Sequence, residues 1–280
     1  MNWSYFFSAW GLPGRYPALF DDPKRGEEAR RVFDDARRLL SEIVDRRLLR
    51  ADGVIGLYPA ASDGDDIVLY ADELRERERM RLPQLRNQQA DRERNLSLAD
   101  FVAPLGSGVK DYVGAFAVTA GLGLEELAGR YRSEGDDYRA IMAKLLADRL
   151  TEAFAEALHR YARVTLWGYE REGQWSVGDL LAEKYQGIRP AFGYPSAPDH
   201  SLKADVFALM DVGTVTGMTM TESYMIVPGE AACGLMLGHP EARNFSVGRI
   251  DSEQLASYAA RRGTDPEKMR VLIPQHLIDM

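Results

Sequence analysis

The order in which helical and strand-like patterns follow one another most limits the fold of this 280-residue chain. Apolar residues recur at helical spacing over 27–49 and again over 136–161. Strand-like runs fall between them, at 53–58, 66–70 and 112–119. A further group of β-branched and aromatic runs over 217–250 is typical of antiparallel strands. Strands and helices come in blocks and do not alternate, which predicts an α+β fold and not a doubly wound parallel sheet.

Local signals complete this outline. The segment 59–66, PAASDGDD, has the Gly, Asp and Ser content of a turn between two strands. The run 112–119 alternates poorly and therefore predicts a buried strand. Shorter helices are expected at 176–184, 202–211, 252–262 and 265–272, the last with a cap and a first-turn proline in Asp265-Pro266. We see no repeat or linker, so one domain over residues 1–280 is expected.

Composition excludes several classes of protein. Hydrophobic residues make up 45% and charged residues 28%, as in ordinary globular proteins. The net charge of −8 argues against nucleic-acid binding, and the mixed-charge run 75–94 is expected to be a solvated face. A single cysteine, Cys233, excludes an internal disulfide, and we expect a reducing cytoplasm. The first residues, Met1 to Tyr5, lack the basic then apolar pattern of a secretory signal, so none is expected, and no apolar run approaches the roughly 20 residues of a membrane helix.

General catalytic motifs do not suggest a function. The chain has neither a phosphate-binding GxxxxGK[ST] sequence nor an HExxH zinc helix, and its four histidines are scattered, so no metal site is predicted. Cys233 lies in an apolar run, where an inert core thiol is expected. These patterns alone indicate only a cytoplasmic α+β domain.

One segment is far more specific. Residues 185–195 read YQGIRPAFGYP and continue as SAPDH. This segment resembles the signature of the activation domain of cobalamin-dependent methionine synthase. Further matches occur in the same order along the chain: NWSYFFSAWGLPGRYP near the start, ADFVAP at 99–104, DYVGAFAVTAG at 111–121, ADRLTEAFAEALH at 147–159 and TGMTMTESYMIVPGEAACG at 216–234. The chain is identified by this resemblance as a member of that family.

The resemblance implies a fold and a function. The fold is a C-shaped single α+β domain with a central twisted antiparallel sheet flanked by helices. Such a domain binds S-adenosylmethionine and supplies its methyl group for reductive reactivation of cob(II)alamin, after flavodoxin or a flavoprotein reductase has delivered an electron. The cobalamin belongs to the methionine synthase core, so this chain is a component of a methyltransferase that is not catalytic alone.

The resemblance also implies ligand contacts in the signature segment. Arg189 is expected to bind the carboxylate of the methionine moiety, because a planar donor fork suits a carboxylate. The alternative is a structural ion pair in an ordered loop. Ala191 and Gly193 are expected to contribute backbone contacts. Tyr194 matches a tyrosine that approaches the cobalt face of the corrin, although a packing role stays open.

Three contact positions depart from the family pattern. Asn2 stands where the family has an aspartate that pairs with the ligand's amino group, and an amide carries no charge for that pairing. Asn244 and Phe245 stand where the family has tyrosines near the adenosine. Phe245 keeps a stacking surface, whereas Asn244 does not. Weaker ligand binding is expected.

Acidic residues are expected to dock the cobalamin domain. Asp148, Glu152 and Glu156 follow one another at i, i+4 spacing on the long helix, where like charges repel. By resemblance, Asp148 and Glu152 receive the histidine released from cobalt, and Glu183 matches an acid linked to reactivation. A solvated acidic stripe is the alternative.

Other functions remain open at this point. The chain could reactivate a different corrinoid methyltransferase, or it could be a non-catalytic S-adenosylmethionine sensor or docking module. Its length predicts either a stand-alone reactivation subunit or a part of a longer chain.

Overall fold

The computed structural model describes residues 1–89 and 95–278. The chain forms two compact units that are assembled from interleaved segments. The first unit comprises Met1–Gly53, Val118–Leu158 and Ile226–Ala232, and the second comprises Val54–Ala117, His159–Met225 and Cys233–Met280. The chain passes from one unit to the other within strands β1 (Arg50–Asp63), β4 (Asp111–Leu122) and β7 (Ala231–Leu237).

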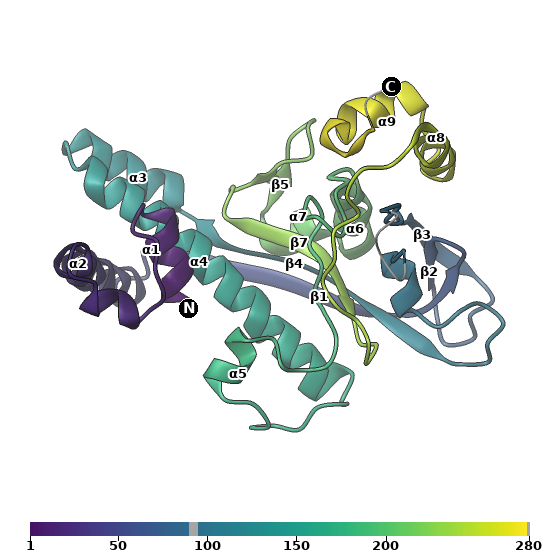
Figure 1. The fold of residues 1–280 in the computed structure, drawn as a ribbon, viewed down its shortest axis with the longest axis horizontal. Helices are drawn as coiled ribbons and strands as arrows, with labels where there is room; N and C mark the ends of the chain where they lie inside the picture. The colour runs from purple at the N-terminus through teal and green to yellow at the C-terminus, as the bar shows by residue number, and fades with distance from the viewer. Residues whose placement is uncertain (90–94, 279–280) are drawn as a thin grey trace. The chain divides into compact units, whose positions relative to one another are not determined.

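The first unit is built mainly from helices (Figure 1). They are α1 (Trp3–Ala9), α2 (Gly26–Asp45), α3 (Leu124–Ser133) and α4 (Asp137–Tyr161), whose last three residues belong to the second unit. Buried apolar side chains from all four helices form one core cluster. The helix predicted over 136–161 is therefore confirmed, whereas α1 and α3 were not predicted.

Helix α2 ends at Asp45, four residues before the end of the predicted helix. Arg47 adopts a left-handed φ of 52°, which closes the helix. The Leu48 amide then donates to the Ile43 carbonyl at 2.9 Å and the Arg47 amide donates to the Val44 carbonyl at 3.2 Å. This is the Schellman pattern, which satisfies the last carbonyls of a helix. Leu48 and Leu49 still pack against the core cluster, so their apolar spacing continues past the helix itself.

The second unit contains most of a five-stranded antiparallel sheet with strand order β3-β2-β1-β4-β7. Strand β1 pairs with β2 (Asp66–Tyr70) through Ala60↔Leu69, and β2 pairs with β3 (Glu78–Pro83) through Ile67↔Leu82. The turn predicted over 59–66 is wrong for most of its length, because β1 continues to Asp63 with Ala60 and Ala61 buried in the sheet. The turn is limited to Gly64, which has a φ of 60°, and Asp65.

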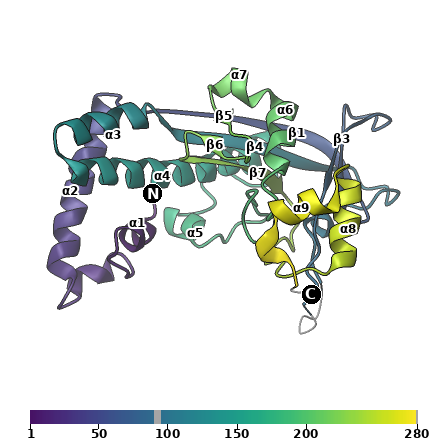
Figure 2. The same cartoon turned by 90° about the horizontal axis from the view of Figure 1, so that it is seen from above.

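Among its described residues, the second unit also contains five short α-helices. They are α5 (Val177–Leu181), α6 (Leu202–Met210), α7 (Val212–Thr216), α8 (Ser252–Arg261) and α9 (Pro266–Leu272). Figure 2 shows α8 and α9 side by side, and Asp265 caps α9 ahead of Pro266 as predicted. Of the strands predicted over 217–250, only β5 (Thr219–Met220), β6 (Ile226–Val227) and β7 form. The prediction is wrong for 238–250, which is irregular apart from an isolated bridge at Ile250.

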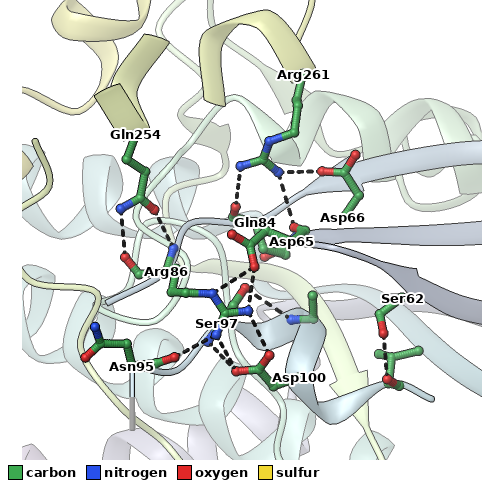
Figure 3. A network of polar contacts seen from close by, with 12 residues as sticks. Ser62, Asp65, Asp66, Gln84, Arg86, Asn95, Ser97, Asp100, Gln254 and Arg261 are labelled. Atoms are coloured by element: carbon green, nitrogen blue, oxygen red, sulfur yellow. Dashed lines mark hydrogen bonds and ion pairs between the residues drawn. The ribbon is translucent and has the colours of Figure 1, made fainter. Parts of the chain in front are cut away.

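A polar network fastens α8 to the end of the sheet (Figure 3). Arg86 binds Asp100 through two hydrogen bonds of 2.8 Å and also contacts Asp65. The Gln254 side chain on α8 accepts from the Arg86 amide at 2.7 Å and donates to its carbonyl at 3.0 Å. The expectation of a solvated face over 75–94 is therefore wrong for residues 82–87, which β3 brings into packed surroundings. Residues 90–94 lie outside the described part of the chain.

Within residues 1–89 and 95–278, no helix is both long and apolar enough to cross a membrane. Cys233 is buried, and burial raises the pKa of its thiol, as expected for a core cysteine.

Candidate ligand-binding site

The 185–195 segment is an irregular strip that adds to the outer edge of β7. The Ile188 and Leu237 amides each donate to the other residue's carbonyl at 2.9 Å. Further along, the Leu235 amide donates to the Pro190 carbonyl at 3.0 Å. Because β7 is an edge strand of the sheet, these bonds hold the strip without requiring regular strand geometry.

Two glycines allow this close approach. A Cβ atom at Gly234 would lie 2.1 Å from the Pro190 carbonyl oxygen, so β7 can carry only glycine opposite the strip. Gly193 has a φ of 94°, and a Cβ atom there would lie 2.3 Å from the His200 ring. The Gly193 amide donates to the Ala197 carbonyl at 2.8 Å, which closes a tight turn. Tyr194, at the tip of this turn, has 56% of its surface exposed.

Arg189 lies in the middle of the strip and is partly buried. Its Nη1 donates to the hydroxyl of Tyr185 at 2.7 Å. A guanidinium has five N–H donors in a planar fork, which suits it to binding an anion. The carboxylate-binding role of Arg189 and the alternative of a structural ion pair both stay predictions.

A buried polar cluster lies behind Tyr185. The Arg163 guanidinium stacks over the Tyr185 ring at 3.7 Å from the centroid, and its Nε donates to Glu170 at 2.8 Å. The His159 ring meets the edge of the Tyr185 ring at a centroid separation of 5.2 Å. Burial lowers the pKa of His159 well below its usual value of 6.5, and the nearby Arg163 and Arg189 lower it further. The imidazole is therefore neutral.

An open cavity of about 380 Å³ lies on the other side of this cluster. Its walls are polar and aromatic side chains: Tyr169, Glu170, Gln174, Trp175, Lys184, Tyr185, Gln186 and Pro240. Burial raises the pKa of Tyr169 to about 12. The volume is that of sites for small organic molecules, which range over about 300–1,000 Å³. Tyr185 thus lines the cavity and also contacts Arg189 through its hydroxyl.

The structure brings two other predicted residues together. The Asn244 amide donates to the Glu183 carboxylate at 3.1 Å, although the sequence placed these residues in different roles. Phe245 packs against the apolar cluster around α8. Its ring lies edge to face with the Phe101 ring, at a centroid separation of 6.3 Å. Asn244 and Glu183 are exposed, whereas Phe245 is partly buried.

The remaining predicted residues belong to the first unit. Asn2 is the N-cap of α1, where its side-chain oxygen accepts from the Ser4 amide at 3.1 Å. Asp148, on α4, forms an ion pair with the adjacent Arg149. Asp148, Glu152 and Glu156 are all partly buried, so a fully solvated stripe does not describe them.

Sequence reasoning did not single out the cluster around Tyr185. Tyr185 itself begins the quoted signature, which was the available signal. Arg163 and Glu170 lie outside every motif, and His159 ends the quoted 147–159 motif but was given no role there. Their role depends on the fold, because they meet only where the end of α4 and the π-helical turn after it (Ala162–Leu166) pack behind the strip.

Taken together, the edge strip with its arginine and the open polar cavity that Tyr185 lines form a candidate binding site for a small polar ligand. Comparison with known proteins identifies the family. Residues 1–263 match the family described as vitamin B12 dependent methionine synthase, activation domain. The chain is also 42% identical to a solved crystal structure of the MetH reactivation domain bound to AdoHcy, with a TM-score of 0.97, over 100% of this chain and 86% of that one. The chain therefore belongs to the activation domains of vitamin B12-dependent methionine synthase.

Proposed function

We propose that this chain binds S-adenosylmethionine and supplies its methyl group for reductive reactivation of cob(II)alamin in methionine synthase. The observation that carries the proposal is the solved reactivation domain with AdoHcy bound, to which this chain is 42% identical over its whole length. S-adenosylhomocysteine is what remains of S-adenosylmethionine after methyl transfer. The strip at 185–195 and its arginine are a suitable place for the amino-acid part of such a ligand.

The residue roles in this proposal follow from their chemistry. Arg189 binds the ligand carboxylate through its planar donor fork. Ala191 and Gly193 present backbone groups, and Tyr194 covers the side facing the partner's corrin. Asn2 accepts from the ligand's amino group, and Asn244 and Phe245 contact the adenosine. No general base is required, because the sulfonium methyl group is transferred with its leaving group already activated, and the domain acts by positioning it.

Family membership implies the cobalamin-binding core of methionine synthase as partner. The reduced corrin of that core supplies the nucleophile that takes the methyl group. We propose that flavodoxin or a flavoprotein reductase delivers the electron in the cytoplasm. Asp148, Glu152 and Glu183 contribute the acidic surface that docks the core.

Calorimetric titration with S-adenosylmethionine tests the ligand assignment. One-to-one binding is expected, and Arg189→Ala should weaken it by about 1.5–3 kcal/mol, or about 10- to 150-fold, the range for a hydrogen bond to a charged group. Arg77→Ala, at an exposed arginine of the same unit, is the matched control and should bind normally. An unchanged dissociation constant in Arg189→Ala would remove this residue from the site.

Docking is tested separately, by reactivation of a methionine synthase core that lacks its own activation domain. The double variant Asp148→Asn/Glu152→Gln should bind S-adenosylmethionine normally but reactivate the core more slowly. The control Glu126→Gln/Glu134→Gln removes two acidic charges at exposed positions of the same unit and should reactivate at the normal rate. Equal rates for both double variants would mean that the α4 acids are only a surface feature.

A further inference from the structure

Tyr185 connects the strip to the buried polar cluster. Its side chain is buried, with 7% of its surface exposed, and its hydroxyl accepts from Arg189 Nη1 at 2.7 Å. A phenol oxygen is neutral, so it orients the guanidinium without neutralising its charge. A carboxylate in this place would compete with the ligand for the same donors.

The Tyr185 ring is itself held from behind. Arg163 has no exposed side-chain surface, and its guanidinium lies 3.7 Å from the ring centroid, well within the range of a cation–π contact. Glu170, with 4% of its side chain exposed, pairs with Arg163 at 2.8 Å. The pair is neutral overall, and it fixes the guanidinium plane that covers one face of the tyrosine.

His159 adds a third contact at the ring edge. It is completely buried, and among the described residues neither of its ring nitrogens has a hydrogen-bond partner. Burial and the adjacent arginines keep its pKa low, so the imidazole packs as a neutral ring. Tyr185 therefore has packed surroundings on its face and on its edge, and only its hydroxyl side faces Arg189.

A tyrosine hydroxyl held in this way reduces the conformational entropy that the Arg189 side chain loses when the ligand binds. An arginine side chain has many rotamers, and ordering a side chain of this kind opposes association. A hydroxyl held by a rigid ring restricts the guanidinium before the ligand arrives. The benefit applies only to a ligand group that Arg189 itself contacts.

We propose that Tyr185 is a positioning residue that orients Arg189 for the ligand carboxylate, and that the Arg163–Glu170 pair holds Tyr185 in place. This inference rests on the proposed function, since it takes S-adenosylmethionine and S-adenosylhomocysteine as the ligands. It predicts that the cluster governs the preference for ligands that carry the carboxylate, and not affinity for the nucleoside.

The test compares two ligands on the full chain by calorimetry. One is S-adenosylhomocysteine, and the other is its decarboxylated analogue, which keeps the adenosine, thioether and amine. The ratio of their affinities is the carboxylate preference. Tyr185→Phe should reduce this preference about fivefold, as expected for loss of one orienting hydrogen bond, and should leave affinity for the analogue within about twofold. The combined Arg163→Met/Glu170→Gln variant removes both buried charges and should reduce the preference similarly.

Controls separate the possible failures. Tyr112→Phe also loses a hydroxyl contact, to Glu73 at 2.8 Å, and should change neither affinity. If wild type shows no carboxylate preference, or if Arg189→Ala keeps it, the proposed ligand assignment fails. Suppose that Arg189→Ala removes the carboxylate preference. If Tyr185→Phe then keeps the preference, or lowers the affinity for both ligands by the same factor, the ligand assignment stands and only the positioning role of Tyr185 is wrong. An unchanged preference in the combined variant would overturn the role of the Arg163–Glu170 pair.

Discussion

Replacing Glu170 by glutamine should destabilise the protein strongly. The Arg163 and Glu170 side chains are 0% and 4% exposed, and 2.8 Å separates Nε from Oε2. At an effective dielectric near 20, unit charges at this distance attract by about 6 kcal/mol, and desolvation of the two ions offsets most of that. The intact pair is therefore nearly neutral in net stability. Glutamine keeps the size but leaves the arginine charge buried, which costs about 3–5 kcal/mol.

Urea unfolding measures this free energy. Circular dichroism and tryptophan fluorescence should give coincident transitions if unfolding is two-state. A loss of about 3 kcal/mol is a large part of a typical stability of about 5–15 kcal/mol. Because the pair is buried, the loss should change little between about 0.1 and 1 M sodium chloride.

The neighbouring Arg160–Glu172 pair supplies the control. Its side chains are 39% and 75% exposed, so Glu172→Gln should cost less than about 0.5 kcal/mol. The double variant Arg163→Met/Glu170→Gln removes both buried charges and should lie within about 1 kcal/mol of wild type. The reasoning is refuted if Glu170→Gln costs no more than Glu172→Gln, or if the double variant is less stable than Glu170→Gln.

Three further outcomes are expected. His159 stays neutral in the folded protein because burial depresses its pKa, whereas in the unfolded chain it becomes protonated as the pH falls below its usual pKa of 6.5. Wild type should therefore lose about 1.4 kcal/mol more unfolding free energy than His159→Gln between about pH 7.5 and 5.5. Urea unfolding of both proteins at these two pH values measures this, and equal losses in the two proteins would contradict it. Gly234→Ala should destabilise the protein and weaken S-adenosylmethionine binding, because the added Cβ would collide with the strip backbone. The control Gly229→Ala, whose added Cβ would have no atom within 4 Å, should change neither property in the same unfolding and calorimetric assays. Asn2→Asp keeps a good N-cap and adds a negative charge for the ligand's ammonium group. Its affinity for S-adenosylmethionine should therefore be about fivefold higher than that of wild type at low salt, with a smaller gain at high salt. Equal affinities of wild type and Asn2→Asp at both salt concentrations would show that another residue holds the amine.

Much of the secondary structure could be predicted from the chain alone. Long helices such as α4 have enough apolar periodicity to be unambiguous, and Asp265-Pro266 marked the start of α9 correctly. The boundaries were less predictable. Residues 59–62 resemble a turn by composition, yet pairing of Ala60 and Ala61 with β2 makes them a buried strand. Local preference was overruled there because the turn is only two residues long, Gly64 and Asp65, so the residues before it pair directly with β2.

The residues around the candidate site also differ in whether the sequence alone pointed to them. The signature motif pointed to Arg189, Gly193 and Tyr194 because a short backbone segment with fixed chemistry is visible as contiguous letters. The requirement for glycine at 234 was not visible, since it comes from the Pro190 carbonyl oxygen 2.1 Å away from a Cβ placed there.

The family and the mixed fold were thus determined by the amino-acid sequence itself, which also predicted Arg189 as the central arginine of the proposed site. Only the tertiary structure decided what surrounds that arginine. No local pattern links Arg163, Glu170 and Tyr185, and arginine and glutamate are mostly exposed in proteins unless they are paired. They become one cluster because burial makes an unpaired charge too costly, so the fold must bring a carboxylate to Arg163 and an aromatic face beneath it.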